Sequence, residues 1–270
     1  INWNIVAYPE LAWAKQVCPG DSDDRAVARL ADAIFAASRV DGDDPIGAWA
    51  AHNAALKERT IWLNGHRFHA LHFTGPGTDL TVGLADGHEW MGGAAPAKNG
   101  IVCNPNIPTE EVFTTPHARR VSGRVSSTKP LSYQGTLIDE ISVRFEEGRI
   151  VEATASKGAD VLNKVLDTDE GARRLGEVAL VPNSSPISAS GILFYNTLFD
   201  ENASCHIALG QCYSKCFVDG DKLSADEIAA RGGNKSLIHI DWMIGSGNVD
   251  IDGVHEDGRR VPVMRKGEWA

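Results

Sequence analysis

Apolar and polar residues near the start of the chain alternate between strand-like and helix-like spacing. The apolar run at residues 5–7 predicts a short buried strand. Apolar residues at helical spacing follow Ser22 and Asp23 and predict a helix from about residue 24. A second helix is predicted to begin at Asp44 and Pro45, an N-cap followed by a first-turn proline, and to end near residue 65. Two strands, joined by a Gly-Pro-Gly turn, are then predicted over residues 67–73 and 80–84.

Beyond about residue 100 the pattern changes to short alternating segments. These predict an antiparallel sheet with strands over residues 121–125, 131–138, 141–146 and 149–153. Helices are predicted over residues 159–166 and 168–175, and strands over residues 178–181 and 236–244. The glycine- and alanine-rich stretch from residue 92 resembles a linker. We therefore expect an incomplete α/β part over residues 1–95, followed by an α+β domain with a mixed or antiparallel sheet over residues 96–270.

Composition and charge narrow the classes of function. The 270 residues carry a formal net charge of −10, with no clustered basic surface, which argues against a nucleic-acid partner. No apolar run reaches the length of a membrane span. An odd number of cysteines, five, favours free thiols in a reducing compartment such as the cytoplasm. The sequence opens without methionine on a strand-like stretch, so we expect that a preceding segment is missing.

His239 and Asp241 are the most compact pair of candidate metal ligands. Two residues apart on an apolar strand, they leave the same face, while Ile238, Ile240 and Trp242 cover the other. Burying an imidazole beside a carboxylate is costly unless something compensates, and a divalent cation does so. A hydrogen-bonded His–Asp pair without a metal is the alternative.

A second cluster contains His206 and Tyr213 among apolar residues and cysteines. A lone histidine in such a setting is more often a core residue than a ligand. Cys205, Cys212 and Cys216 suggest a structural zinc site, but no second cysteine pair exists to complete a tetrahedral thiolate site. Structural or incidental thiols are therefore the preferred interpretation.

Three further carboxylates are candidates for chemistry. Glu110 and Glu111 are adjacent on an extended segment, so they point in opposite directions, and one could bind a metal while the other reaches the water beside it. Such pairs are commonly solvated surface, but apolar neighbours frame this one. Glu177 heads an apolar strand, where it is either a helix-end charge or an inward-facing ligand. Together these clusters form an oxygen-rich set that suits two divalent ions sharing carboxylates better than one tetrahedral zinc.

Four sequence motifs resemble those of a known protein family. They are PTEEVFTTP at residues 108–116, TDEGARRLGEVALV at 168–181, NTLFDENASCHIALG at 196–210 and HIDWMIG at 239–245. With GPGTDLTVGL at residues 75–84, they resemble the thermophilic aminopeptidases, peptidase family M29, the aminopeptidase T and aminopeptidase S group. The resemblance runs from residue 3 to residue 270 and implies an N-terminal α/β domain followed by a catalytic α+β domain. Chains of the family begin well upstream of Ile1.

The resemblance also implies roles for individual residues. It makes Glu111, Glu177, His206, His239 and Asp241 metal ligands and places Tyr213 at the position of the family's active-site tyrosine, as a further ligand or a donor to the oxyanion. It implies two divalent ions (zinc, cobalt or magnesium), a cytoplasmic homodimer, and peptide substrates with a free N-terminus. Glu110 would be the general base, by analogy with other two-metal aminopeptidases.

Two other classes of function stay open at the level of the sequence. One is a non-catalytic binding protein on a peptidase scaffold, although every acidic and imidazole position is filled. The other is a metal-dependent amidase or esterase, which would use the same ions on a different substrate.

Overall fold

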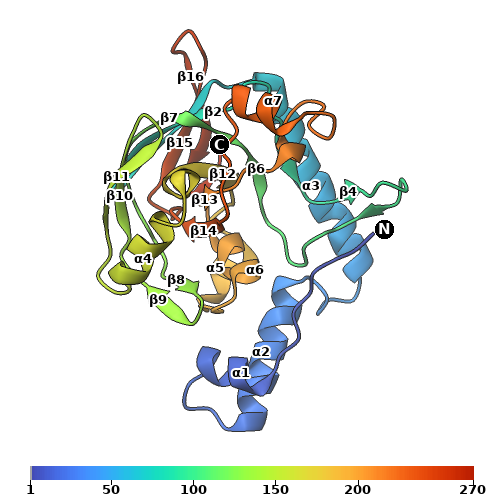
Figure 1. Ribbon diagram of the computed structural model, residues 1–270. Coiled ribbons are helices and arrows are strands. Elements are labelled where there is room, and N and C mark those ends of the chain that lie inside the picture. Colours follow the sequence, from blue (N-terminus) through green and yellow to red (C-terminus); the bar gives the residue numbers. More distant parts are fainter. Residues whose placement is uncertain (1) are drawn as a thin grey trace.

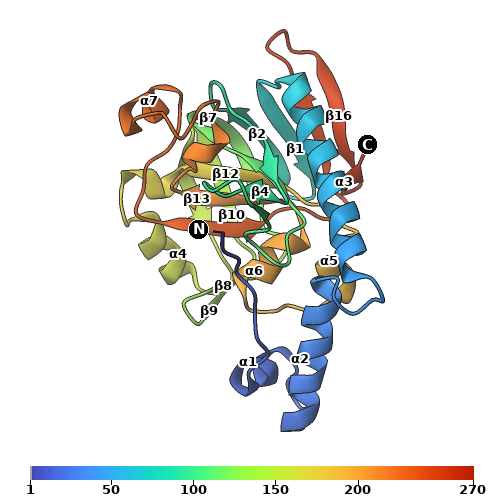
Figure 2. The ribbon, with the colours of Figure 1, turned by 90° about the vertical axis from the view of Figure 1, so that its right-hand side faces the viewer.

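The structure is a computed structural model, and it describes residues 2–270. The strands form a central body, and the long helix α3 (Pro45–His66) lies along one side of it (Figure 1). Helices α1 (Leu11–Val17) and α2 (Asp23–Ala37) project together from one end of this body (Figure 2). The predicted combination of helices with antiparallel sheets is confirmed.

The two long helices begin where the sequence predicts. Helix α2 starts at Asp23, directly after Ser22. Helix α3 starts at Pro45, and the side chain of Asp44 accepts a hydrogen bond from the Gly47 N–H, which satisfies one of the free donors of the first turn. The helix ends at His66, one residue beyond the predicted end, because Arg67 adopts the left-handed conformation.

The predicted strand at residues 5–7 is wrong. Ile5 makes only an isolated parallel bridge to Asn106, and the surrounding residues are irregular. The backbone of Ile5 bonds to Pro105 and Ile107 instead of joining a sheet, and Ile5 and Trp3 stay 48% and 56% exposed. An apolar run is a strand only where neighbouring strands can satisfy its backbone groups.

Eight antiparallel strands form the larger sheet, in the order β11-β10-β7-β2-β1-β15-β16-β17. They are β1 (Ala70–Gly75), β2 (Thr78–Leu84), β7 (Pro116–Ser126), β10 (Ser142–Glu146), β11 (Arg149–Thr154), β15 (Asp250–Val254), β16 (Arg260–Arg265) and β17 (Glu268–Trp269). Strands predicted on both sides of residue 95 pair directly, β2 with β7. The division into residues 1–95 and 96–270 stays a prediction.

Five antiparallel strands form the smaller sheet, in the order β14-β13-β12-β6-β3. They are β3 (Met91–Gly92), β6 (Val112–Thr114), β12 (Leu175–Leu180), β13 (His206–Gly210) and β14 (His239–Met243). Every residue of β12 and β13 is buried. This sheet carries most of the candidate ligands.

Two of the predicted elements, over residues 131–138 and 168–175, need correction. Residues 131–138 form a hairpin, β8 (Leu131–Tyr133) and β9 (Thr136–Ile138), because Gln134 and Gly135 both have positive φ and turn the chain. The helix predicted over residues 168–175 is only the 3-10 turn η1 (Glu170–Arg173), since Leu175 already pairs with β13. Helix α4 (Ala159–Leu166) forms as predicted.

The remaining elements are short. They are β4 (Ala95–Pro96), β5 (Val102–Cys103), α5 (Pro186–Ser190), α6 (Thr197–Asp200), η2 (Glu201–Ala203), η3 (Ser214–Cys216) and α7 (Ala225–Ala230). Across residues 2–270, no helix is both long and apolar enough to cross a membrane.

Two hydrophobic cores hold these elements together. The larger core joins both sheets, for example through Phe73 and Leu80 on one and Val178 and Ile207 on the other. A separate core packs α1 and α2 against α5 and α6. The segment α6–η2 therefore lies between the projecting helices and the smaller sheet.

Candidate metal centre

Three neighbouring strands of the smaller sheet carry four of the candidate ligands. Glu177 lies on β12, His206 on β13, and His239 and Asp241 on β14. In the register of the sheet, Ala208 of β13 pairs with Glu177 on one side and with Asp241 on the other. Directly paired residues project from the same face. Two carboxylates therefore flank a small side chain, which leaves room between them above the central strand.

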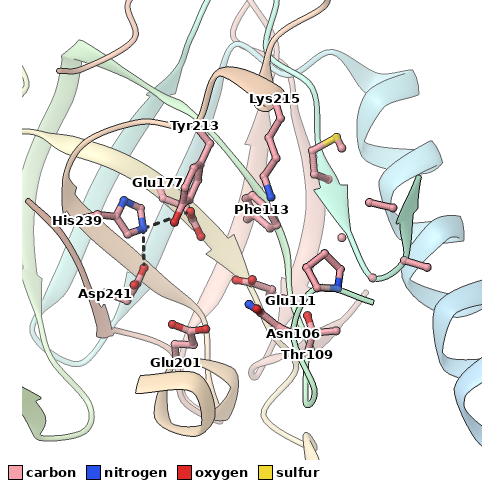
Figure 3. Close-up of a pocket in the computed structure, with 16 residues that line it drawn as sticks. Asn106, Thr109, Glu111, Phe113, Glu177, Glu201, Tyr213, Lys215, His239 and Asp241 are labelled. Carbon is pink, nitrogen blue, oxygen red and sulfur yellow. Dashed lines mark ion pairs between the residues drawn. The ribbon is translucent and has the colours of Figure 1, made fainter. Parts of the chain in front are cut away.

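Glu111 completes the group from the residue before β6, the strand beside β12. Its Oε2 lies 3.1 Å from His206 Nε2, and Glu177 Oε1 lies 3.7 Å from the same nitrogen. His239 Nε2 lies 3.5 Å from Asp241 Oδ1 and 3.7 Å from Glu177 Oε2 (Figure 3). The five side chains form two clusters that share Glu177.

These two clusters have the spacing of metal sites. In one, potential ligand atoms of Glu111, Glu177 and His206 all lie within 4.8 Å of one another, and in the other those of Glu177, His239 and Asp241 do. A carboxylate shared by two clusters is the usual bridge between paired divalent ions. The structure thus brings together all five residues that the sequence motifs selected as ligands.

Both histidines present the same nitrogen to the clusters. His206 Nδ1 lies 3.2 Å from the Ser204 carbonyl oxygen, and His239 Nδ1 lies 2.7 Å from the Gln211 carbonyl oxygen. A carbonyl can only accept, so it fixes the proton on Nδ1 and leaves the lone pair of Nε2 toward the carboxylates. This second contact is typical of metal-binding histidines.

Two buried atoms at the centre lack the partners that burial requires. His206 Nε2 and Glu111 Oε2 face each other, yet neither makes a well-formed hydrogen bond within residues 2–270. Leaving a buried polar atom unsatisfied costs about 1–3 kcal/mol. A divalent ion between them would satisfy both atoms at once, so the donor set fits a metal.

The protonation equilibria also indicate a missing positive charge. Burial raises the pKa of Glu177 to about 7, despite its contact with His206. Burial alone would lower the pKa of His206, but contacts with Glu111 and Glu177 outweigh it and raise that pKa well above its usual value. Burial likewise opposes the charged form of His239, yet Asp241 raises its pKa to about 9. Without an ion, this site retains protons to balance its carboxylates.

Tyr213 lies beside His239 of the second cluster, and its role as a further metal ligand or as a hydrogen-bond donor stays a prediction. Its ring centre is 4.7 Å from that of His239, and its side chain lines the pocket while remaining 40% exposed. Burial, with repulsion from Glu177, raises the pKa of its hydroxyl, which therefore stays protonated at neutral pH. A protonated hydroxyl at this place can donate a hydrogen bond into the pocket.

Glu110 is directed away from the clusters. Its carboxylate forms a two-pronged ion pair with the guanidinium of Arg39, at the end of α2, and does not line the pocket. Its backbone N–H donates to Asn202 Oδ1 at 2.6 Å. His52 Nε2 approaches the carbonyl of the preceding Thr109 at 2.6 Å. The role of Glu110 as general base stays a prediction, and in this geometry it requires the ion pair to open.

Glu201 is the residue that sequence reasoning missed. It begins η2, lines the pocket, and lies half-buried beside the clusters (Figure 3). Burial and repulsion from Asp241 and Glu111 raise its pKa well above the usual value. One signal could have found it: Asp200–Glu201 is an adjacent acidic pair like Glu110–Glu111, inside the motif that carries His206.

The cysteines lie apart from the clusters. Neither metal-like group within residues 2–270 contains a cysteine, and all five thiols are free. Burial raises the pKa of Cys205 and Cys212 to about 11, so both stay protonated, whereas metal binding needs the thiolate. The geometry favours the interpretation of these residues as structural thiols.

The clusters form the floor of a cavity of about 130 Å³. Its far wall is built of small residues, Gly92, Gly93, Ala94 and Ala95, at the β3–β4 connection. A Cβ added to Gly92 would lie 2.7 Å from the Glu111 carbonyl oxygen, so glycine is needed there for the wall to approach β6. The cavity is thus lined by carboxylates at the ligand clusters and by small residues at the β3–β4 connection.

Comparisons with known proteins point to one family. A family model described as "Thermophilic metalloprotease (M29)" matches residues 1–269. Aminopeptidase T of Thermus aquaticus is 58% identical over 268 residues, which cover 99% of this chain and 65% of that protein. Aminopeptidase AmpS of Bacillus subtilis is 47% identical over 270 residues, covering 100% of this chain and 66% of that protein.

A solved structure agrees with these sequence comparisons. The structure titled "Wild-type AmpT from Thermus thermophilus" superposes with a TM-score of 0.93 at 55% identity, and the match covers 100% of this chain and 65% of that one. This chain therefore spans about 65% of the length of the relatives it matches. Since the family model covers residues 1–269, the chain belongs to the thermophilic metalloproteases, family M29.

Proposed function

We propose that this chain is the metal-binding part of an aminopeptidase, which releases amino acids one at a time from peptides with a free N-terminus. The observation that carries the proposal is the pair of clusters sharing Glu177 at the floor of the cavity. The names of the relatives, which are aminopeptidases, support it.

The ligands divide between two positions. Glu111 and His206 would hold one ion, His239 and Asp241 the other, and Glu177 would contact both. Two divalent ions bound there would lower the pKa of a water molecule toward neutrality and polarise the scissile carbonyl. One ion could also bind the free amine of the substrate, which would account for cleavage from the N-terminus.

Tyr213 and one of two glutamates would supply the proton chemistry. The protonated Tyr213 hydroxyl would donate a hydrogen bond to negative charge developing on the carbonyl oxygen. A general base would take a proton from water and pass it to the leaving nitrogen. Glu201 lines the cavity, which supports this role for it, whereas Glu110 would first have to leave Arg39.

The metal, the assembly and the compartment belong to the same proposal. The donor set is three carboxylates and two imidazoles, which suits zinc, cobalt or magnesium. Five free thiols, four of them buried, suit a reducing cytoplasm. A homodimer is proposed from the family resemblance alone.

Activity on matched substrates tests the proposal. Metal-loaded protein should cleave an aminoacyl amide and lose this activity in chelator, and added zinc, cobalt or magnesium should restore it. N-acetylated and ester analogues of the same amino acid should be cleaved far more slowly. Faster cleavage of the acetylated or ester substrate would favour an amidase or esterase. Full metal loading with no turnover of any substrate would favour a binding protein.

A further inference from the structure

Lys215 is a cation at the edge of an otherwise acidic cavity. It lies on η3, and its Nζ is 4.9 Å from the centre of the Phe113 ring and 5.2 Å from that of Tyr213. Figure 3 shows the side chain extending between these two rings toward the interior of the cavity. Ring faces attract an ammonium group, so the two aromatic residues hold this flexible side chain in place.

The ammonium group of Lys215 has no counter-ion in the part of the chain that the structure describes. Within residues 2–270 it forms neither an ion pair nor a hydrogen bond, although four carboxylates line the same cavity. It is also the only lysine or arginine among the lining residues of the described chain. Its three N–H donors are thus free for a bound molecule.

We propose that Lys215 binds a substrate carboxylate located within the first two residues of the peptide. This inference rests on the proposed aminopeptidase function. The carboxylate belongs either to the C-terminus of a dipeptide or to an acidic side chain at the second residue.

The dimensions agree with a dipeptide. Phe113 is two residues beyond Glu111 in extended backbone, which corresponds to roughly 7 Å along the chain. A dipeptide in extended form spans roughly the same distance. Tyr213 connects the other side, since its ring lies 4.7 Å from His239 and 5.2 Å from Lys215 Nζ. Both observations are compatible with a dipeptide bound between the clusters and the ammonium group.

Charge complementarity points the same way. A dipeptide carries an amino group at one end and a carboxylate at the other. The cavity has its carboxylates in and beside the two ligand clusters and its single ammonium group at the rim. Outside the proposed ion sites, Lys215 is the group among the described lining residues that would attract a peptide carboxylate, so it would favour binding of a short peptide with its carboxylate at the rim.

Binding of non-cleavable peptides tests the inference without relying on turnover. The probes are leucyl-glycine analogues with a methylene in place of the scissile carbonyl, ending in a free carboxylate or in an amide. A second pair, leucyl-aspartate and leucyl-asparagine analogues with amidated ends, separates the two sources of carboxylate. Calorimetry on the metal-loaded protein would measure Kd for wild type, Lys215→Met and Lys215→Arg. Lys222→Met is the matched control, because that exposed lysine pairs with Asp219 outside the cavity.

We expect wild type to bind at least one carboxylate probe about 10-fold more tightly than its neutral partner, as for one charge-assisted hydrogen bond. Lys215→Met should remove the difference, while Lys215→Arg and Lys222→Met retain it. The wild-type preference should also weaken at high salt, which requires no variant. Equal affinity of wild type for charged and neutral probes would overturn the proposed role of Lys215 and leave the proposed function intact. An equal loss of binding affinity for charged and neutral probes in Lys215→Met would do the same. If no probe binds and no aminoacyl substrate is cleaved, the proposed function fails as well.

Discussion

Two pairs of adjacent acidic residues divide their duties in the same way. Glu111 faces the metal clusters, while Glu110 pairs with Arg39. Glu201 lines the cavity, while Asp200 accepts backbone hydrogen bonds from Phe194 and Asn196. In each pair, one carboxylate faces the site, while its neighbour makes a supporting contact elsewhere: an ion pair for Glu110 and backbone hydrogen bonds for Asp200. The role of an acidic residue here follows from its contacts rather than from its type.

Replacing Glu201 and Glu110 one at a time with glutamine distinguishes a general base from a residue that only stabilises the fold. Glu201→Gln should lower turnover by roughly 10²–10⁴-fold, as for loss of a general base, with a melting temperature at or above wild type because a buried negative charge is removed. Glu110→Gln should instead lower the melting temperature, since it leaves the Arg39 guanidinium without its partner, at a cost of about 3 kcal/mol.

Turnover, metal content and thermal melts on both variants distinguish the outcomes. Full stability of Glu110→Gln together with loss of turnover would assign the base to Glu110, as the analogy with other two-metal aminopeptidases predicts. Loss of metal from Glu201→Gln would make Glu201 a ligand rather than a base.

The metal-free protein should lose stability as the pH rises. The pKa of Glu177 is raised from 4.5 to about 7 and that of His239 from 6.5 to about 9. A raised pKa in the folded state contributes stability that is present below the ordinary value and disappears as the pH rises through the folded value. The melting temperature in chelator should therefore fall between pH 5 and pH 9, by on the order of 5 °C.

Bound metal should reverse this dependence, because ions replace the protons. Saturating metal should raise the melting temperature most at pH 8–9, and calorimetry in buffers of different ionisation enthalpy should detect proton release. A metal-free protein that melts higher at pH 9 than at pH 6 would contradict the proposed balance of charges.

At the scale of elements, the space for metal depends on the small residues of the central strand β13. Ala208 lies between Glu177 and Asp241, and Gly210 pairs with His239. Ala208→Val should weaken metal binding at least tenfold, because added methyl groups would occupy the space between the carboxylates, with an overpacking cost of about 1–3 kcal/mol. Ile207→Val, on the opposite face of the same strand, is the control and should cost about 1 kcal/mol while keeping metal. Unchanged metal affinity in Ala208→Val would place the ions elsewhere.

The sequence predicts elements well where the pattern is local. The starts of α2 and α3 lie close to the capping residues that predict them, and five of the eight strands of the larger sheet (β1, β2, β7, β10 and β11) follow from alternation, whereas β15, β16 and β17 are not predicted. Prediction from the sequence fails where pairing with distant strands determines the local structure. Residues 5–7 have strand-like composition but no sheet partner, and residues 168–175 lose their helix because Leu175 joins β12.

The site could be predicted only in part for the same reason. His239 and Asp241 are two apart on one strand, so their common face follows from the sequence. The pair of Arg39 and Glu110 joins residues 71 apart, and no local pattern indicates it. Glu201 lies in a 3-10 turn, whose side-chain directions have no simple period.

At the scale of the molecule, the candidate site lies where the two hydrophobic cores meet. Phe199 and Ala203 belong to the core of the projecting helices, and they flank Glu201. Ile207 and Trp242, on the strands below the ligands, belong to the core of the sheets. The carboxylates therefore sit on rigid supports from two directions, which offsets the cost of holding so many like charges together.

Anomalous diffraction from crystals of this protein soaked in zinc or cobalt tests the central claim most directly. We expect two anomalous-difference peaks, one for each metal ion, roughly 3.5–4 Å apart. One should lie between Glu111 and His206, the other between His239 and Asp241, with Glu177 in contact with both. Peaks at Cys212 and Cys216, or no peak beside Glu177 at saturating metal, would contradict it.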